Sequence, residues 1–115
     1  MEDQNKQEIF QHFYVVVDLD KKQKGKLAIL EQSNVDEEGP FLHFESINGR
    51  SIWKENIHNI DSIEKVAQSE EDLRVVMIDE SKSVFFRFLT GEAKLEITLI
   101  LSKINSRIRL LDDSI

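Results

Sequence analysis

The stretch that decides the fold is TGEAKLEITLILSKINSRIRLL, residues 90–111. Its large aliphatic side chains recur at intervals of three and four, which places them on one face of an α-helix. Thr90 is a suitable N-cap, and the arginines near the end complement the negative end of the helix dipole. The sequence therefore predicts one amphipathic helix over residues 90–111. The apolar stripe consists of Ile97, Ile100, Leu101, Ile104, Ile108 and Leu111, with Lys94, Glu96, Lys103, Arg107 and Arg109 between its members.

Before residue 90 the chain consists mostly of short segments rich in β-branched and aromatic residues, which are typical of strands. Turn residues separate them: Gly25 can supply one turn, and Asn48-Gly49 is a strong hairpin signal. A parallel α/β fold needs helices between its strands, and the sequence leaves no room for them. We therefore expect about seven antiparallel strands followed by one helix. The expected strand segments are residues 9–19, 26–32, 41–46, the two ends of 51–68, 73–78 and 83–89.

The segment SIWKENIHNIDSIEKVAQ, residues 51–68, has two interpretations. Its apolar residues are spaced by three and four, which suits a helix. Two strands joined by a short turn give the same spacing if Ile57 fills the core between them. Periodicity alone does not decide between these structures.

Length and composition limit the classes of protein that fit. A chain of 115 residues suits one hydrophobic core, so we expect one domain at residues 9–111 between polar tails at 1–8 and 112–115. No segment approaches the ~18 apolar residues of a membrane span, and the polar N-terminus is not a secretory signal. The net charge of −7 argues against a direct nucleic-acid binder, because such proteins gain affinity by neutralising phosphates.

The sequence contains no recognisable catalytic or metal-binding motif. Without cysteine there are no disulfides and no thiol nucleophile. The histidines, His12, His43 and His58, show no metal-ligand spacing, and the acidic runs at 36–38 and 70–72 suit solvated turns. No glycine-rich phosphate cradle or nucleophile elbow is present. We therefore expect no enzyme, no metal and no cofactor.

Two features are candidates for a binding surface. Lys21, Lys22, Lys24 and Lys26 are clustered in one predicted loop. They suit either a solvated hairpin or a site for an anion, such as a lipid headgroup or the acidic side chains of a partner. Trp53 is the sole tryptophan, and packing in or beside the core is its favoured role.

Strands followed by a C-terminal helix resemble the pleckstrin-homology (PH) superfold. Within it, the sequence is similar to the N-terminal PH-like domain of the large non-helicase core subunit of the general transcription factor TFIIH. The resemblance spans residues 12–111 and implies a mainly β (α+β) fold, a seven-stranded antiparallel barrel or sandwich capped by the helix, with two strands in residues 51–68. It is carried by KKQKGKLAIL (21–30), FLHFESINGR (41–50), IDSIEKVAQSEEDLRVVMI (60–78) and SVFFRF (83–88).

The resemblance implies a non-catalytic docking domain of TFIIH in the nucleus. Its partners would be acidic, partly disordered segments of activators, of a basal initiation factor and of nucleotide excision repair proteins; other TFIIH subunits would bind the rest of a longer chain. Lysines at the rim would steer the encounter, and an apolar anchor would supply most of the affinity. The implied partner-binding residues are Lys21, Lys22, Glu64, Lys65, Val66, Ala67, Arg74 and Val76.

One departure and one alternative stand beside this expectation. Glu70, Glu71 and Asp72 occupy a turn where the family tends to place lysines, so an acid-binding groove here is expected to be narrower or weaker. The alternative is a phosphoinositide-binding PH domain that acts at membranes. The lysine loop favours it, but LAILEQ, residues 27–32, lacks the paired basic residues that complete a headgroup site.

Overall fold

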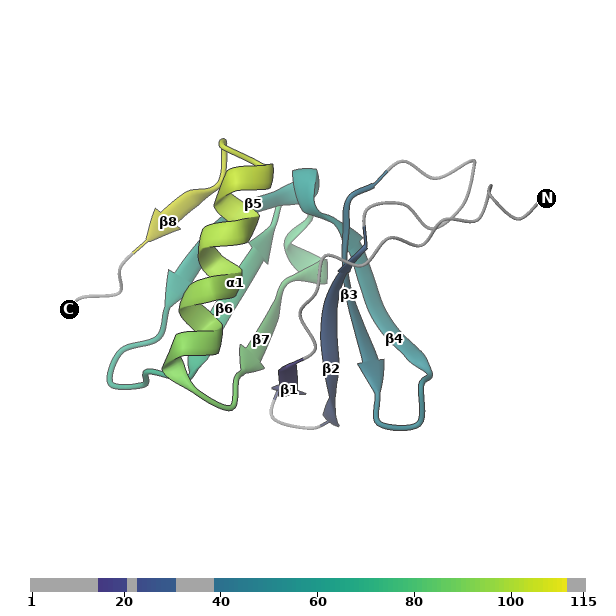
Figure 1. Ribbon diagram of the computed structural model, residues 1–115. Coiled ribbons are helices and arrows are strands. Elements are labelled where there is room, and N and C mark those ends of the chain that lie inside the picture. Colours follow the sequence, from purple (N-terminus) through teal and green to yellow (C-terminus); the bar gives the residue numbers. More distant parts are fainter. Residues whose placement is uncertain (1–14, 21–22, 31–38, 112–115) are drawn as a thin grey trace.

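The computed structural model describes residues 15–20, 23–30 and 39–111, which form a mainly β fold with one α-helix (Figure 1). The described strands follow one hydrogen-bonded order, β4-β3-β2-β1-β7-β6-β5-β8. β4 and β8 are its two edges, so the sheet does not close on itself. The elements are β1 (Val15–Leu19), β2 (Gln23–Leu30), β3 (Phe41–Ser46), β4 (Ser51–Asn56), β5 (Ile60–Lys65), β6 (Asp72–Met77), β7 (Val84–Arg87), α1 (Gly91–Ile104) and β8 (Arg109–Leu111), with short 3₁₀ helices at Ile57–Asn59 and Glu80–Lys82.

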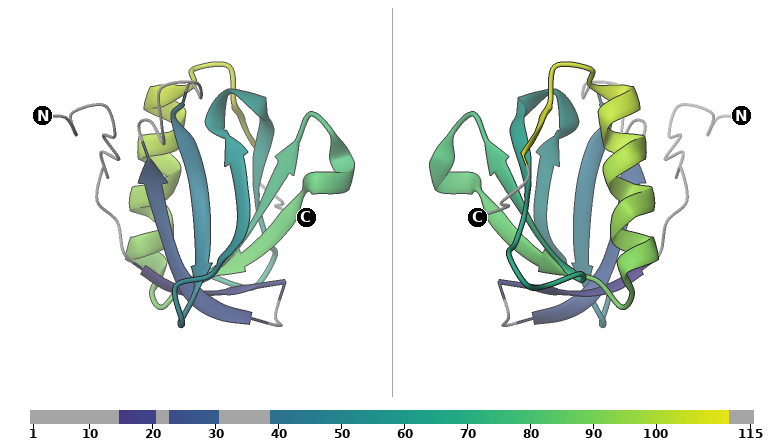
Figure 2. Two further views of the ribbon diagram at one scale, coloured as in Figure 1. Left: turned by 90° about the vertical axis from the view of Figure 1, so that its right-hand side faces the viewer. Right: turned by 90° about the vertical axis from the view of Figure 1, so that its left-hand side faces the viewer.

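The sheet is divided into two halves, β1–β4 and β5–β8. The join between them is narrow, because β1 pairs with β7 through two residue pairs, Asp18 with Arg87 and Leu19 with Phe86. Both halves supply one hydrophobic core, in which Phe44 of β3, Phe86 of β7 and Leu101 of α1 are at most 1% exposed. Figure 2 shows α1 along one side of the bent sheet, opposite the tip of the β6–β7 hairpin.

Residues 51–68 contain two strands and a turn, as the second interpretation predicts. Ile57 lies in the 3₁₀ turn between β4 and β5 and is fully buried, so it fills the core at this corner. The Asn56 side chain accepts a hydrogen bond from the His58 backbone and begins the turn. The predicted hairpin at residues 48–49 is also present, and Gly49 has a φ of 87°.

Trp53 packs at the margin of the core, as expected for a lone tryptophan in a strand. Its ring meets Phe86 edge-on, with 5.6 Å between ring centroids. Its indole nitrogen donates a hydrogen bond of 3.1 Å to the backbone carbonyl of Lys82. This contact ties the β4 edge to the loop between β6 and β7.

Gly25 does not form a turn, which corrects the prediction made for it. It lies within β2 and pairs with Ser46 of β3. A Cβ atom at this position would lie 1.9 Å from the carbonyl oxygen of Glu45, beside the irregularity at Phe44 and Glu45. Glycine is needed here because the two backbones approach closely.

The helix is shorter than predicted and ends at Ile104 rather than at residue 111. The Asn105 side chain donates to the carbonyl of Ile57 at 3.0 Å and accepts from the Arg107 backbone at 3.0 Å. These bonds offer the backbone an alternative to another helical turn, which the apolar spacing does not reveal. Residues 109–111 then form β8, parallel to β5, so the described strands number eight rather than seven.

Parts of the predicted organisation lie outside the described residues. The first strand, predicted from residue 9, is described from Val15 onward. The tails at 1–8 and 112–115 and the acidic run at 36–38 are likewise outside the described ranges.

Candidate functional site

The sheet separates the predicted partner-binding residues onto two faces. In the β5–β6 register, Glu64 lies opposite Arg74, while Lys65 lies opposite the buried Leu73. Because neighbouring side chains on a strand point to opposite faces, Glu64 and Lys65 do not share a surface. We call the face with Glu64, Arg74 and Val76 the outer face; Lys65 lies on the opposite side, which carries α1.

Four predicted residues remain, and only two of them are described. Lys21 and Lys22 lie outside the described residues. Val66 and Ala67 lie in the turn after β5, where Val66 is half-buried and Ala67 is exposed. The structure therefore does not gather the described members of the predicted set into one site.

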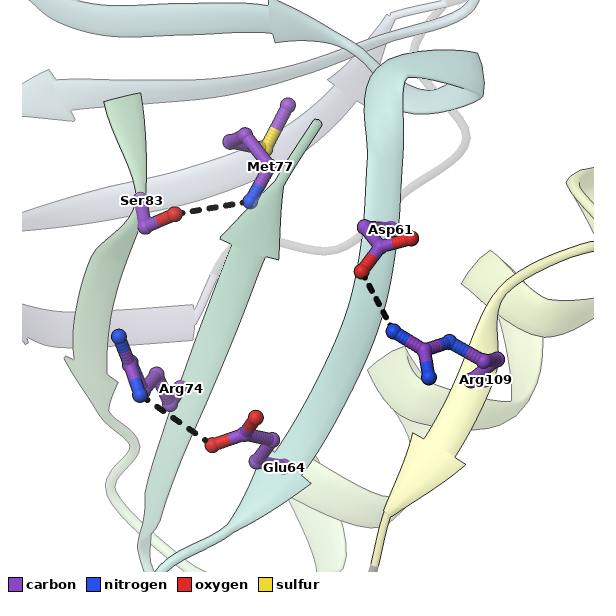
Figure 3. A network of polar contacts seen from close by, with 6 residues as sticks. All are labelled: Asp61, Glu64, Arg74, Met77, Ser83 and Arg109. Carbon is purple, nitrogen blue, oxygen red and sulfur yellow. Dashed lines mark hydrogen bonds and ion pairs between the residues drawn. The ribbon is translucent and has the colours of Figure 1, made fainter. Parts of the chain in front are cut away.

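On the outer face, arginines are held by carboxylates directly across the strands. An Arg74 nitrogen lies 3.4 Å from a Glu64 oxygen (Figure 3). The Arg74 guanidinium also lies 5.7 Å from the centroid of the Phe85 ring. Arg87 bonds Asp72 through two nitrogens, at 2.7 and 3.0 Å. Much of the positive charge on this face is thus already balanced.

Asp72 corrects the prediction that residues 70–72 are solvated turn charges. Glu70 and Glu71 are exposed, but Asp72 begins β6 and is 6% exposed. A buried carboxylate needs a partner, and Arg87 supplies it. The acidic run is therefore partly structural.

A groove of about 260 Å³ lies on the other side of the sheet, between α1 and β8. Leucines line both sides of it, Leu95 and Leu99 on the helix and Leu110 and Leu111 on β8. Each of these leucines is between 38% and 54% exposed. Thr98 and two lysines contribute the polar groups, and none of the described residues that line it is acidic. We call this site the α1–β8 groove; it is lined by Ile63, Lys65, Leu73, Lys94, Leu95, Thr98, Leu99, Leu110 and Leu111.

Lys94 lies on the buried side of α1, not on the polar side where the sequence pattern places it. It precedes Ile97 and Leu101 on the same helical stripe, and it is 9% exposed. Its backbone carbonyl accepts a hydrogen bond of 2.8 Å from Thr98. Within the described residues its ammonium group makes no hydrogen bond or ion pair. Lys65 likewise has no ion pair to a described residue, and it is exposed.

Helix capping and the Asn105 turn together build the groove. Thr90 caps the start of α1, where its hydroxyl accepts a bond of 3.0 Å from Ala93. Asn105 ends the helix, and the chain then returns beside β5, so that β8 forms the second side of the groove. Asp61 and Arg109 join β5 to β8 at 2.7 Å (Figure 3). In the sequence, the groove could have been suspected from Leu95 and Leu99. They lie one helical turn apart but outside the buried stripe of the helix.

A metal centre or a membrane-spanning helix would be a further kind of feature in the described ranges. They contain no group of three or more His, Asp or Glu residues that could hold a metal ion. They also contain no helix long and apolar enough to span a membrane. No protein-family model matches the chain, and no curated protein matches it.

Proposed function

We propose that this chain is a non-catalytic protein-docking domain that binds acidic segments through the α1–β8 groove. In its finer form, the proposal is a PH-like domain of TFIIH in the nucleus, with partners among transcription and nucleotide excision repair factors. The sequence resemblance supports this finer form, as does an order in which strands β1–β7 precede α1. The groove supports docking independently of the family.

The observation that carries the proposal is the combination of exposed leucines and lysines in one groove. Leu99 and Leu110 lie on opposite sides of the groove and are 53% and 51% exposed. Lys65 and Lys94 line the same groove. A segment that carries carboxylates beside an aliphatic side chain complements both features. Burial of the aliphatic anchor would supply most of the affinity, while the charges fix the register.

A titration followed by backbone amide shifts tests this proposal. The ligands are a short acidic peptide with a central leucine and, separately, soluble inositol hexakisphosphate. We expect the peptide to shift the amides of Lys65, Thr98 and Leu110. If instead inositol hexakisphosphate alone binds, with shifts confined to Lys24 and Lys26, the phosphoinositide alternative holds and docking is excluded.

Two substitutions, each of which replaces an exposed aliphatic residue with aspartate, locate the binding surface. Leu99→Asp places a carboxylate in the groove and should weaken peptide binding by about 10-fold or more, because it removes an apolar contact and repels the ligand. Ile47→Asp is the matched control, since Ile47 is a 67% exposed aliphatic residue in the β3–β4 hairpin. Equal affinity of both variants for the peptide would place binding elsewhere.

A further inference from the structure

We infer that Lys94 determines the specificity of the α1–β8 groove by taking the carboxylate of an acidic residue directly beside the aliphatic anchor of a partner peptide. This inference rests on the proposed function, because it names the chemistry of the segment that the groove binds.

The first argument is the burial of Lys94. Its neighbours on the helical stripe, Ile97 and Leu101, are at most 1% exposed, and Lys94 itself is 9% exposed. An ammonium group has three donors, and taking it out of water is costly unless those donors are satisfied. Among the described residues no group forms a hydrogen bond or ion pair with this ammonium. The groove thus contains a lysine that is 9% exposed and whose ammonium group has no partner among the described residues, and a bound carboxylate would supply that partner.

The second argument is the size of the groove. Its volume of about 260 Å³ is below the roughly 300–1,000 Å³ of typical small-molecule sites. It suits one or two side chains better than a whole cofactor. Because Lys94 and the leucines line the same small space, the ligand's carboxylate and its aliphatic group must be close neighbours.

The third argument is the sheet edge beside the groove. β8 pairs with β5 on one side and is the last strand of the sheet order, so its other side faces no strand of the described sheet. An extended peptide can add to such an edge through backbone hydrogen bonds while its side chains enter the adjacent pocket. This favours a peptide as the occupant over a free fatty acid, which has no backbone to pair.

The test uses a synthetic peptide with an Asp-Leu-Asp core between Ser/Gly flanks, and a counterpart with an Asn-Leu-Asn core. Carboxylates on both sides of the leucine make the result independent of peptide direction. Lys94→Met keeps the length and apolar stem of the side chain and removes its charge. Lys103→Met is the control, because Lys103 is an exposed lysine in the last turn of the same helix.

By calorimetric titration, Lys94→Met should weaken Asp-Leu-Asp binding by about 10-fold or more, and Lys103→Met should change it less than about two-fold. The Asn-Leu-Asn peptide should bind the wild type and Lys94→Met with similar, low affinity. The two losses are then not additive, which identifies direct coupling between Lys94 and the peptide carboxylate.

The contrary results are distinct. If Lys94→Met binds Asp-Leu-Asp as the wild type does, while Leu99→Asp abolishes binding, the docking function stands and the role of Lys94 is excluded. Equal losses in Lys94→Met and Lys103→Met would indicate general charge attraction and also overturn the inference. If the wild type binds neither peptide but binds octanoate, both the inference and peptide docking fail.

Discussion

The outer face of β5 and β6 differs from the α1–β8 groove in how each treats its basic residues. On the outer face, Arg74 lies 3.4 Å from Glu64, and nearby Arg87 bonds Asp72 with two hydrogen bonds. In the groove, the described lining residues include Lys65 and Lys94 but no acidic residue. The outer face is therefore charge-balanced by its own strands, whereas the groove is not.

The difference shows that strand register, rather than net charge, decides where a cation is available. Glu64 and Arg74 are directly opposed in the β5–β6 ladder, and Asp72 and Arg87 are opposed in the β6–β7 ladder. Such pairs neutralise each other locally. The protein carries a net charge of −7, yet its groove presents positive charge among leucines. An acidic protein can thus offer a local site for acidic ligands.

The largest expected effect on stability comes from the outer face, where basic and acidic side chains are paired. Arg87→Met removes the guanidinium from Asp72, whose side chain is 8% exposed, while that of Arg87 is 49% exposed. Loss of a partner leaves a buried carboxylate poorly compensated, so the free energy of unfolding should fall by about 2–3 kcal/mol. Urea denaturation measures it, with Arg87→Lys expected to lose less. An unchanged midpoint for Arg87→Met would show that the pair does not stabilise the fold.

The next effect concerns the turn that creates the groove. Asn105→Ala removes the bond to the Ile57 carbonyl and the bond from the Arg107 backbone, both at 3.0 Å. Asn105 is 5% exposed, so the loss should be about 2 kcal/mol of unfolding free energy. The rate of amide hydrogen exchange should increase more in β8 than in β6. Uniform acceleration throughout the sheet would mean that Asn105 does not hold β8 specifically.

Sequence patterns predicted the features that depend on neighbouring residues. The β3–β4 hairpin follows from Asn48-Gly49, and Ile57 at the β4–β5 corner follows from the two-strand interpretation of residues 51–68. β8 could not be found in this way. It has three residues, and its formation depends on a bond from Asn105 to a carbonyl 48 positions earlier. A long-range contact of this kind leaves no periodic signal.

The candidate site was predicted less well, for reasons that differ between residues. The separation of Glu64 from Lys65 was available from the sequence, because consecutive residues of a strand face opposite sides. The position of Lys94 was not, since a lysine in an amphipathic pattern is normally assigned to the polar face. Its burial depends on how α1 packs on the sheet. The structure joins Lys65 to Lys94 in one groove, and the family resemblance did not include Lys94.

In the α1–β8 groove, removal of a positive charge should raise the free energy of unfolding instead of lowering it. Lys94→Met replaces a lysine that is 9% exposed, and whose ammonium group has no partner among the described residues, with an apolar side chain of similar length. The free energy of unfolding should therefore rise by about 1 kcal/mol, because the desolvation cost of the charge disappears. Lys103→Met, at an exposed position, should change it by less than about 0.5 kcal/mol. Destabilisation by Lys94→Met in urea would mean that the ammonium is well satisfied in the free protein.

The smallest effect should come from Arg74, and it separates the two kinds of ion pair on the outer face. The side chains of Arg74 and Glu64 are 44% and 30% exposed, so water screens their interaction. Arg74→Met should lower the free energy of unfolding by less than about 1 kcal/mol, since exposed pairs contribute little. The difference between this variant and the wild type should shrink further at high salt, because added ions screen the pair. The effect of Arg87→Met should change less with salt, since the Asp72 carboxylate is buried. If both variants respond equally to salt, burial does not distinguish the two pairs, and the outer face is uniform in its electrostatics.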